Sequence, residues 1–127
     1  MNILFIHRAY PEQFGPFSQY LAGQGCDVVF ATARTDAPEG QVRIHGAVKV
    51  VGYRPQGTAT CDALHLLQPM ETALRYAQGF AVQAQRMLRG GYTPDVVMAH
   101  AGWGVGSLVK TIWPTAKYIA YGEWWYD

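Results

Sequence analysis

Ile3-Leu4-Phe5-Ile6 is a continuous apolar run, the pattern of a short strand that is buried on both faces of a parallel sheet. Polar and turn residues follow it, and Pro16 fits the first turn of a helix, where its missing N–H costs nothing. Gly25 is placed to end that helix in a left-handed conformation. Asp27-Val28-Val29-Phe30-Ala31 predicts the next strand, so residues 3–31 form one strand–helix–strand unit with a right-handed crossover.

The same alternation continues along the chain. Further elements are predicted as strands at residues 48–53, 95–99 and 117–121, a long helix from Pro69 to the glycines at 90–91, and a short helix within residues 102–111. Polar residues between them predict loops at residues 32–41 and 54–60. This order predicts one α/β domain over residues 1–127 with a doubly wound, mainly parallel, Rossmann-like sheet.

The long helix carries an apolar stripe at steps of three and four residues. Its members are Leu67, Met70, Leu74, Ala77, Ala81, Ala84 and Leu88. Side chains at this spacing share one face of a helix, so the stripe is expected to pack on the sheet.

Composition excludes several classes of protein. Half of the 127 residues are hydrophobic and 15% are charged, so the chain is not disordered. The net charge is only +1 and no basic cluster occurs, which argues against a nucleic-acid partner. Cys26 and Cys61 are expected to be buried reduced thiols, and the dispersed histidines predict no metal site. No membrane-spanning run or signal peptide is evident, so a reducing, cytoplasmic location is the default expectation.

Candidate ligand-binding residues follow three of the predicted strands. Ligands of open parallel sheets bind beyond the carboxyl ends of the strands, so residues 7–15, 100–104 and 122–125 should meet at one edge. This edge would gather His7, His100, Glu123 and several aromatic side chains. A neutral imidazole at His100 can exchange a proton near physiological pH; the alternative is that it holds loop backbone in place.

Familiar phosphate and nucleophile motifs are incomplete. Residues 104–111 nearly match G-x-x-x-x-G-K-[ST], but Val109 replaces the glycine whose backbone would wrap a phosphate. No G-x-G-x-x-G follows the first strand, which argues against a dinucleotide-dependent dehydrogenase, and no Gly-x-Ser-x-Gly elbow is present. Gly15 before Pro16 either presents a helix N-terminus to an anion or merely permits a turn.

Four segments together carry a family resemblance. They are residues 3–14, with Tyr10-Pro11-Glu12-Gln13-Phe14, residues 21–29, residues 94–104 and residues 121–126. On these segments the chain resembles the N-terminal domain of family 4 glycosyltransferases, which are retaining enzymes of GT-B architecture. It is most similar to a bacterial subgroup that begins with a strand, a histidine and a Phe/Tyr-Pro-x-Gln-Phe loop.

The resemblance implies a role for each matching residue. Gln13, Phe14 and Gly15 would approach the diphosphate of a nucleotide-sugar donor, and His100 would be the catalytic residue beside the transferring sugar. The remaining substrate-binding residues would be His7, Trp103, Glu123 and Trp124. Transfer would need no metal and no cofactor besides the nucleotide sugar as co-substrate. Glu12 departs from the small residue that is usual there, and a carboxylate near a diphosphate is repulsive.

The family's C-terminal, donor-binding domain is absent from these residues, so the domain alone is expected to be inactive. Its acceptor would be a glycan or a lipid-linked sugar, with peripheral attachment to the inner face of the membrane left open. Two other functions also remain open: a GT-B-type sugar-nucleotide epimerase, and a non-catalytic, flavodoxin-like ligand-binding module. A response regulator is disfavoured because His7 and Arg8 stand where acidic residues are needed.

Overall fold

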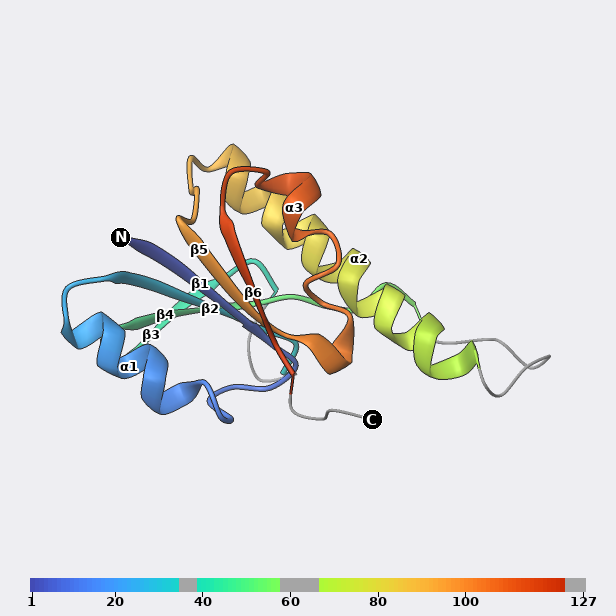
Figure 1. Cartoon of the computed structure of the whole chain (residues 1–127), viewed down its shortest axis with the longest axis horizontal. Helices are drawn as coiled ribbons and strands as arrows, with labels where there is room; N and C mark the ends of the chain where they lie inside the picture. The colour runs from blue at the N-terminus through green and yellow to red at the C-terminus, as the bar shows by residue number, and fades with distance from the viewer. Residues whose placement is uncertain (35–38, 58–66, 123–127) are drawn as a thin grey trace.

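A computed structural model describes residues 1–34, 39–57 and 67–122 of the chain. They form a six-stranded sheet with the order β3-β4-β2-β1-β5-β6 (Figure 1). In chain order the elements are β1 (Asn2–His7), α1 (Gly15–Gly23), β2 (Asp27–Thr32), β3 (Val42–His45), β4 (Val48–Gly52), α2 (Gln68–Arg89), β5 (Val96–His100), a 3-10 turn (Ala101–Trp103), α3 (Val109–Ile112) and β6 (Lys117–Tyr121). Every pair of neighbouring strands is parallel except β3 and β4. The predicted doubly wound α/β fold is therefore confirmed.

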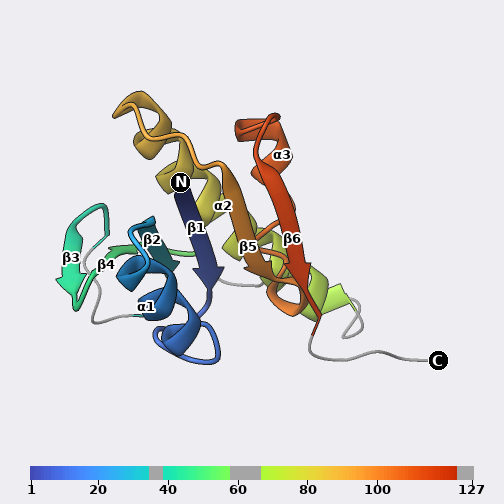
Figure 2. The same cartoon turned by 60° about the vertical axis from the view of Figure 1, so that its left-hand side comes forward.

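The helices lie on both sides of the sheet. Figure 2 shows α1 on one face and α2 with α3 on the other. Each face has its own buried cluster, because alternate residues of a strand point to opposite sides. On β1, Leu4 and Ile6 join the cluster beneath α2 and α3, whereas Ile3 and Phe5 join the cluster beneath α1. The apolar run of β1 is thus buried on both faces, as the sequence predicts.

Both long helices end in the way that their glycines predict. After α1, Gly25 has φ +88°; its N–H donates to the Ala22 carbonyl, and the Cys26 N–H donates to the Leu21 carbonyl. Gly91 has φ +86° and ends α2 with the same pair of hydrogen bonds. This is the Schellman arrangement, which needs a left-handed residue and so favours glycine.

The cysteine prediction is tested at one position. Cys26 is a free thiol that is half-buried rather than fully buried, and it packs against the cluster beneath α1. Cys61 lies outside the described residues.

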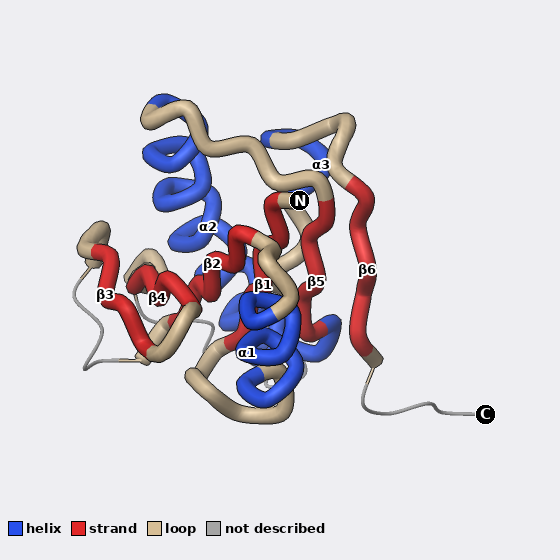
Figure 3. Tube along the Cα trace, turned by 90° about the vertical axis from the view of Figure 1, so that its left-hand side faces the viewer, coloured by secondary structure: helices blue, strands red, loops and turns tan. Residues whose placement is uncertain are grey.

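Strand β3 was missed by the sequence analysis, which predicted no strand between residue 32 and Val48. It pairs antiparallel with β4, and Gly46-Ala47 forms a two-residue turn between His45 and Val48 (Figure 3). All four of its residues are exposed. A four-residue edge strand with neither face buried lacks the apolar pattern that identifies a buried strand.

The predicted apolar stripe of α2 is wrong for most of its members. Four of them are exposed to solvent, namely Leu67, Met70, Leu74 and Leu88. The helix instead buries Ala77, Gly79, Phe80, Gln83 and Ala84. The N-terminal turns of α2 reach past the sheet, so that they have no strand beneath them (Figure 1). The helix therefore meets the sheet along only its central turns.

Two tyrosines on the α2 side have enclosed hydroxyl groups: Tyr53 is fully buried and Tyr92 is partly buried. Burial is the main cause that raises the pKa of the Tyr53 phenol far above its ordinary value; Tyr76 adds to the rise and Arg8 opposes it. Burial also raises the pKa of Tyr92. Within the described part of the chain neither hydroxyl has a hydrogen-bond partner. The folded state therefore holds both phenols in the protonated form.

We expect the free energy of unfolding to fall as the pH rises above about 10, the ordinary pKa of tyrosine. The unfolded chain loses these protons there while the folded chain keeps them, so each buried tyrosine costs about 1.4 kcal/mol per pH unit, and none below that pH. Urea denaturation at about pH 8, 10 and 11 measures the slope. Tyr53→Phe should remove the part of the slope that one tyrosine proton contributes. The double variant Tyr53→Phe with Tyr92→Phe should remove the contributions of two protons. Equal slopes in the parent and the double variant would contradict this explanation.

Candidate functional site

Two histidines meet at the centre of the sheet's carboxyl edge. His7 is the last residue of β1 and His100 the last residue of β5, and these neighbouring strands run parallel, with Ile6 opposite Ala99. The two rings lie edge to face with their centroids 5.1 Å apart. Both side chains are buried. The chain leaves β1 toward α1 and β5 toward α3, on opposite faces, so the edge opens at this position.

The backbone that follows each strand holds its histidine by one ring nitrogen. The Gly102 N–H donates to His100 Nδ1 at 3.2 Å within the 3-10 turn. In a neutral ring this places the proton of His100 on Nε2. His7 Nδ1 lies 2.8 Å from the Ala9 carbonyl oxygen and 3.1 Å from the Ala9 nitrogen. The Nδ1 atom of each histidine is thus held by the backbone that follows its strand.

A cavity of about 300 Å³ opens at this pair. Its lining residues are His7, Arg8, Ala9, Glu12, Gln13, His100 and Trp103. Four of the residues that the sequence analysis chose, His7, Gln13, His100 and Trp103, are thus brought together from two parts of the chain. We call this space the histidine cavity.

The other chosen residues lie elsewhere. The Phe14 ring is buried in the core. Its centroid lies 5.2 Å from that of the Tyr121 ring and 5.7 Å from that of the His7 ring, so it packs against His7 and does not line the cavity itself. Gly15 begins α1, where a Cβ would come within 2.5 Å of Pro11 Cβ. Glu123 and Trp124 lie outside the described residues. The donor contact suggested for Gln13, Phe14 and Gly15 stays a prediction.

Arg8 also lines the histidine cavity, and the sequence analysis did not choose it as a site residue. Its guanidinium carbon lies 4.9 Å from the centre of the Trp103 ring and 5.3 Å from that of Tyr76 on α2. Stacking uses the faces of the guanidinium and leaves its N–H edge for an oxyanion. Its carbonyl is also fixed, since it accepts from the Ala33 N–H at 3.0 Å. Arg8 directly follows the first strand, and that position was its only available signal.

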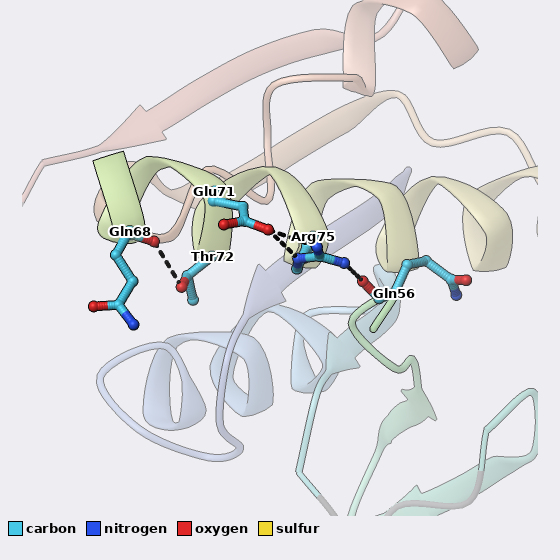
Figure 4. Close-up of polar contacts among 5 residues, drawn as sticks. All are labelled: Gln56, Gln68, Glu71, Thr72 and Arg75. Atoms are coloured by element: carbon cyan, nitrogen blue, oxygen red, sulfur yellow. Dashed lines mark hydrogen bonds and ion pairs between the residues drawn. The ribbon is translucent and has the colours of Figure 1, made fainter. Parts of the chain in front are cut away.

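Hydrogen bonds fix the N-terminal turns of α2 next to Tyr76, whose ring contacts Arg8. Figure 4 shows Arg75 between two partners: its Nε donates to Glu71 Oε1 at 3.0 Å, and its Nη1 donates to the Gln56 carbonyl at 2.7 Å. The Gln56 N–H in turn donates to the Arg75 carbonyl at 3.1 Å. These bonds anchor the turn before Tyr76, so that its ring is held beside Arg8.

Comparison with known proteins identifies the family. The chain matches the glycosyl transferase family 4 group over residues 24–127. It belongs to that family. The match includes His100 and Trp103, whereas the loop from His7 to Gly15 precedes it. No curated protein matches the chain closely enough to count as a relative.

Family 4 membership supports a glycosyltransferase function, with a sugar donor and an acceptor as substrates in general. Among residues 1–34, 39–57 and 67–122 of this glycosyltransferase domain, no three His, Cys, Asp or Glu side chains gather as metal ligands. None of the helices in those ranges is both long enough and apolar enough to span a bilayer.

The histidine cavity of the glycosyltransferase domain offers three kinds of polar group. Two imidazoles can hold sugar hydroxyls through Nε2, and Arg8 can hold phosphate oxygens. Glu12 also lines the cavity, with φ +35°, a left-handed backbone that is uncommon outside glycine. If a diphosphate entered this cavity, the predicted repulsion by Glu12 would be opposed by the positive charge of Arg8, which lines the same cavity.

Proposed function

We propose that this domain is the N-terminal, acceptor-side half of a retaining glycosyltransferase of GT-B architecture. It would act with a donor-binding domain and transfer a sugar from a nucleotide sugar to a glycan or lipid-linked acceptor, in the cytoplasm or at the inner face of the membrane. Family membership supports the class of reaction. The single observation that carries the proposal is the histidine cavity, where His7, His100 and a stacked Arg8 meet at the centre of the sheet edge.

Each group has a part in the proposed reaction. Arg8 offers in-plane N–H donors to the donor's phosphate oxygens, next to the loop of Gln13. His100 Nε2 holds a hydroxyl of the transferring sugar, since its Nδ1 is bound by Gly102. His7 and Trp103 contact the acceptor, and the Trp103 ring, 36% exposed, is available for stacking on a sugar face.

The bonds and charges balance without a further reactant. The bond between the anomeric carbon and the donor phosphate oxygen breaks, and the nucleoside diphosphate leaves with the electron pair. The acceptor hydroxyl oxygen bonds to that carbon on the same face, which retains the configuration. The hydroxyl proton passes to the leaving phosphate oxygen. Positive groups near the diphosphate stabilise the charge that develops in this transition state.

The function is tested by incubating the full-length protein with nucleotide sugars, with and without glycan and lipid-linked acceptors, and analysing products by mass spectrometry. We expect nucleoside diphosphate and a glycosylated acceptor to form together, and only when the acceptor is present. A new sugar without any acceptor would establish the epimerase instead. Tight binding of a ligand without turnover would establish a binding module, and either result overturns the proposal.

Arg8→Ala is expected to weaken binding of a nucleoside diphosphate at least about tenfold, because a charge-assisted hydrogen bond contributes roughly 1.5–3 kcal/mol. Arg8→Lys should recover only part of the affinity, since an ammonium lacks the planar fork that stacks on Trp103 and Tyr76. Isothermal titration of the full-length protein with UDP measures both. Arg89→Ala, an exposed change at the far end of α2, is the matched control. Unchanged affinity in Arg8→Ala would remove Arg8 from the site.

A further inference from the structure

A second cavity lies between the first turns of α2 and the 3-10 turn that follows β5. Its described lining residues are Gln68, Pro69, Thr72, Ala73, Tyr76, Gly102 and Trp103. We call it the α2 groove. Its volume of about 330 Å³ is near the lower end of the range for small-molecule sites, about 300–1,000 Å³. The groove therefore suits one small ring rather than a long chain.

Helical spacing brings one wall of the groove together. Positions 68, 69, 72, 73 and 76 recur at steps of three and four residues, so their side chains share one face of α2. Figure 4 shows Gln68 and Thr72 on the same side of its first turns. The opposite wall consists of Gly102 and Trp103 in the 3-10 turn.

Two contacts hold these walls at a fixed separation. Gly104 has φ +65°, and a Cβ there would lie 2.8 Å from Ala73 Cβ and 3.1 Å from the Ala73 carbonyl oxygen. The backbone that follows the 3-10 turn thus meets α2 directly. Arg8 also links the two walls, because its guanidinium packs on both Tyr76 and Trp103. The shape of the groove is therefore set by the fold before a ligand binds.

The α2 groove combines aromatic surface with neutral polar groups. Its described lining carries no charged side chain. Trp103, which is 36% exposed, and Tyr76 supply the aromatic surface. The Thr72 hydroxyl donates to the Gln68 carbonyl at 2.9 Å, so its oxygen keeps lone pairs that can accept, and the exposed Gln68 amide can both donate and accept.

This combination matches the chemistry of a sugar. A sugar ring has an apolar face of C–H groups, which packs on aromatic side chains, and a rim of hydroxyls, which exchange hydrogen bonds with amides and hydroxyls. A lipid chain could cover the aromatic surface, but it offers no hydrogen bond to Gln68 or Thr72. The described lining therefore favours a sugar.

The α2 groove adjoins the histidine cavity. Trp103 lines both spaces. Arg8 lines the histidine cavity, and its guanidinium carbon lies 5.3 Å from the centre of the Tyr76 ring, which lines the groove. A ligand that occupies the histidine cavity can therefore continue past Trp103 into the groove.

We propose that the α2 groove binds a second sugar residue of the acceptor. This inference rests on the proposed function, which places the first acceptor sugar in the histidine cavity, and it assigns the acceptor's chemical class. The terminal sugar lies in the histidine cavity, and the next sugar packs on Trp103 and exchanges hydrogen bonds with Gln68 and Thr72. The acceptor is accordingly a glycan of at least two sugars rather than a single sugar.

The test titrates the full-length protein, without donor, with four disaccharides in separate arms: maltose, cellobiose, lactose and N,N′-diacetylchitobiose. Glucose, galactose and N-acetylglucosamine are the single-sugar arms, and octyl glucoside is the lipid-like arm. Amide shifts of Thr72 and Ala73 in NMR spectra report the α2 groove, while those of Arg8 and Ala9 report the histidine cavity. We expect at least one disaccharide to shift both sets saturably, and to bind at least about fivefold more tightly than its own single sugars, because two linked sugars occupy both sites.

Two substitutions of glutamine on α2 separate the groove from the rest of the helix. Gln68→Ala should weaken binding of that disaccharide at least about threefold, because a hydrogen bond to the second sugar is lost. Gln85→Ala makes the same change at an exposed position near the other end of α2 and should leave the affinity unchanged.

Three results would overturn this inference. The first is that no disaccharide shifts Thr72 and Ala73, and the second is that only octyl glucoside shifts them, which would place a lipid chain in the groove. The third is that Gln68→Ala loses no more affinity than Gln85→Ala. None of these touches the proposed function, because the titration involves no turnover. Conversely, a protein that binds a disaccharide in the groove but forms no glycosylated acceptor would overturn the proposed function while the sugar site itself stands.

Discussion

Gly79→Ala is expected to destabilise the domain by at least about 3 kcal/mol, at the upper end of what overpacking usually costs. A Cβ at this position would lie 1.8 Å from the Arg54 carbonyl oxygen and 2.9 Å from Pro55 Cα. These are backbone atoms, which cannot rotate away as a flexible side chain would. Helix α2 would have to move away from Arg54 and Pro55, which follow β4. Thermal unfolding should show a fall in Tm of roughly 10 °C.

Gly23→Ala is the matched control for that variant. Gly23 also lies in a helix, the last residue of α1, and a Cβ there would meet no atom within 4 Å. Because alanine favours the helix more than glycine does, we expect stability to rise by roughly 0.5–1 kcal/mol. Equal effects of the two substitutions would show that helix propensity, and not the approach of α2 to Arg54, governs Gly79.

His100→Asn is expected to lower kcat for sugar transfer at least about 100-fold, which corresponds to about 2.7 kcal/mol. The shorter amide can still accept the Gly102 N–H in place of Nδ1, so the loop after β5 keeps its hydrogen bond. It cannot reach the position of Nε2, which holds the transferring sugar in the proposed mechanism. Activity should therefore be lost while Tm stays near that of the parent.

His100→Gln gives the complementary result. Its longer amide can place a donor near the position of Nε2, so part of the transfer activity should return. If His100 only held the loop, the His100→Asn variant would retain activity. Steady-state kinetics would then give a kcat near that of the parent, and the Tm would be unchanged as well. Activity that survives in His100→Asn would thus contradict a catalytic role and leave a structural one.

The strands were predictable because a strand that is buried on both faces needs a run of apolar residues, and such runs are visible in the sequence. Residues 117–121 were predicted and found as β6. Strands β2 and β4 differ from their predictions by one residue at one end, and β1 and β5 by one residue at both ends. In β1, β2, β5 and β6 the apolar residues are continuous, and in β4 only Lys49 interrupts them. The helix ends were equally clear, because only a residue that tolerates a positive φ suits positions 25 and 91.

The errors share one physical cause. A local sequence pattern does not show which distant element, if any, packs against it. Periodicity put Met70 and Leu74 on a common face of α2, but it could not show that the sheet ends before that part of the helix. The missed strand β3 has no buried side at all. Both depend on the relative placement of distant elements, on which spacing along the chain carries no information.

The site was predictable only in part, because the sequence shows where strands end but not which distant side chains meet. The rule for parallel sheets brought His7 and His100 to one edge, and the structure places their rings side by side. Arg8 could not be recognised, because its partners Tyr76 and Trp103 are 68 and 95 residues away in the chain, as their numbers show. The cavity of about 220 Å³ beside the β3–β4 hairpin is lined in part by Arg43, Ile44 and His45 of β3, so it could not be predicted once β3 had been missed.

The central position of β1 sets the order in which the domain can form during translation. β1 is paired on one side with β2, Ile3 opposite Val28, but on the other with β5, Ile3 opposite Val96. At ribosomal rates of roughly 5–20 residues per second, the second partner appears roughly 5–20 s after β1 is made. For that interval one edge of this apolar strand is open, and an open strand edge exposes a nascent chain to wrong pairing. The pair of strands that carries His7 and His100 is thus among the last to close.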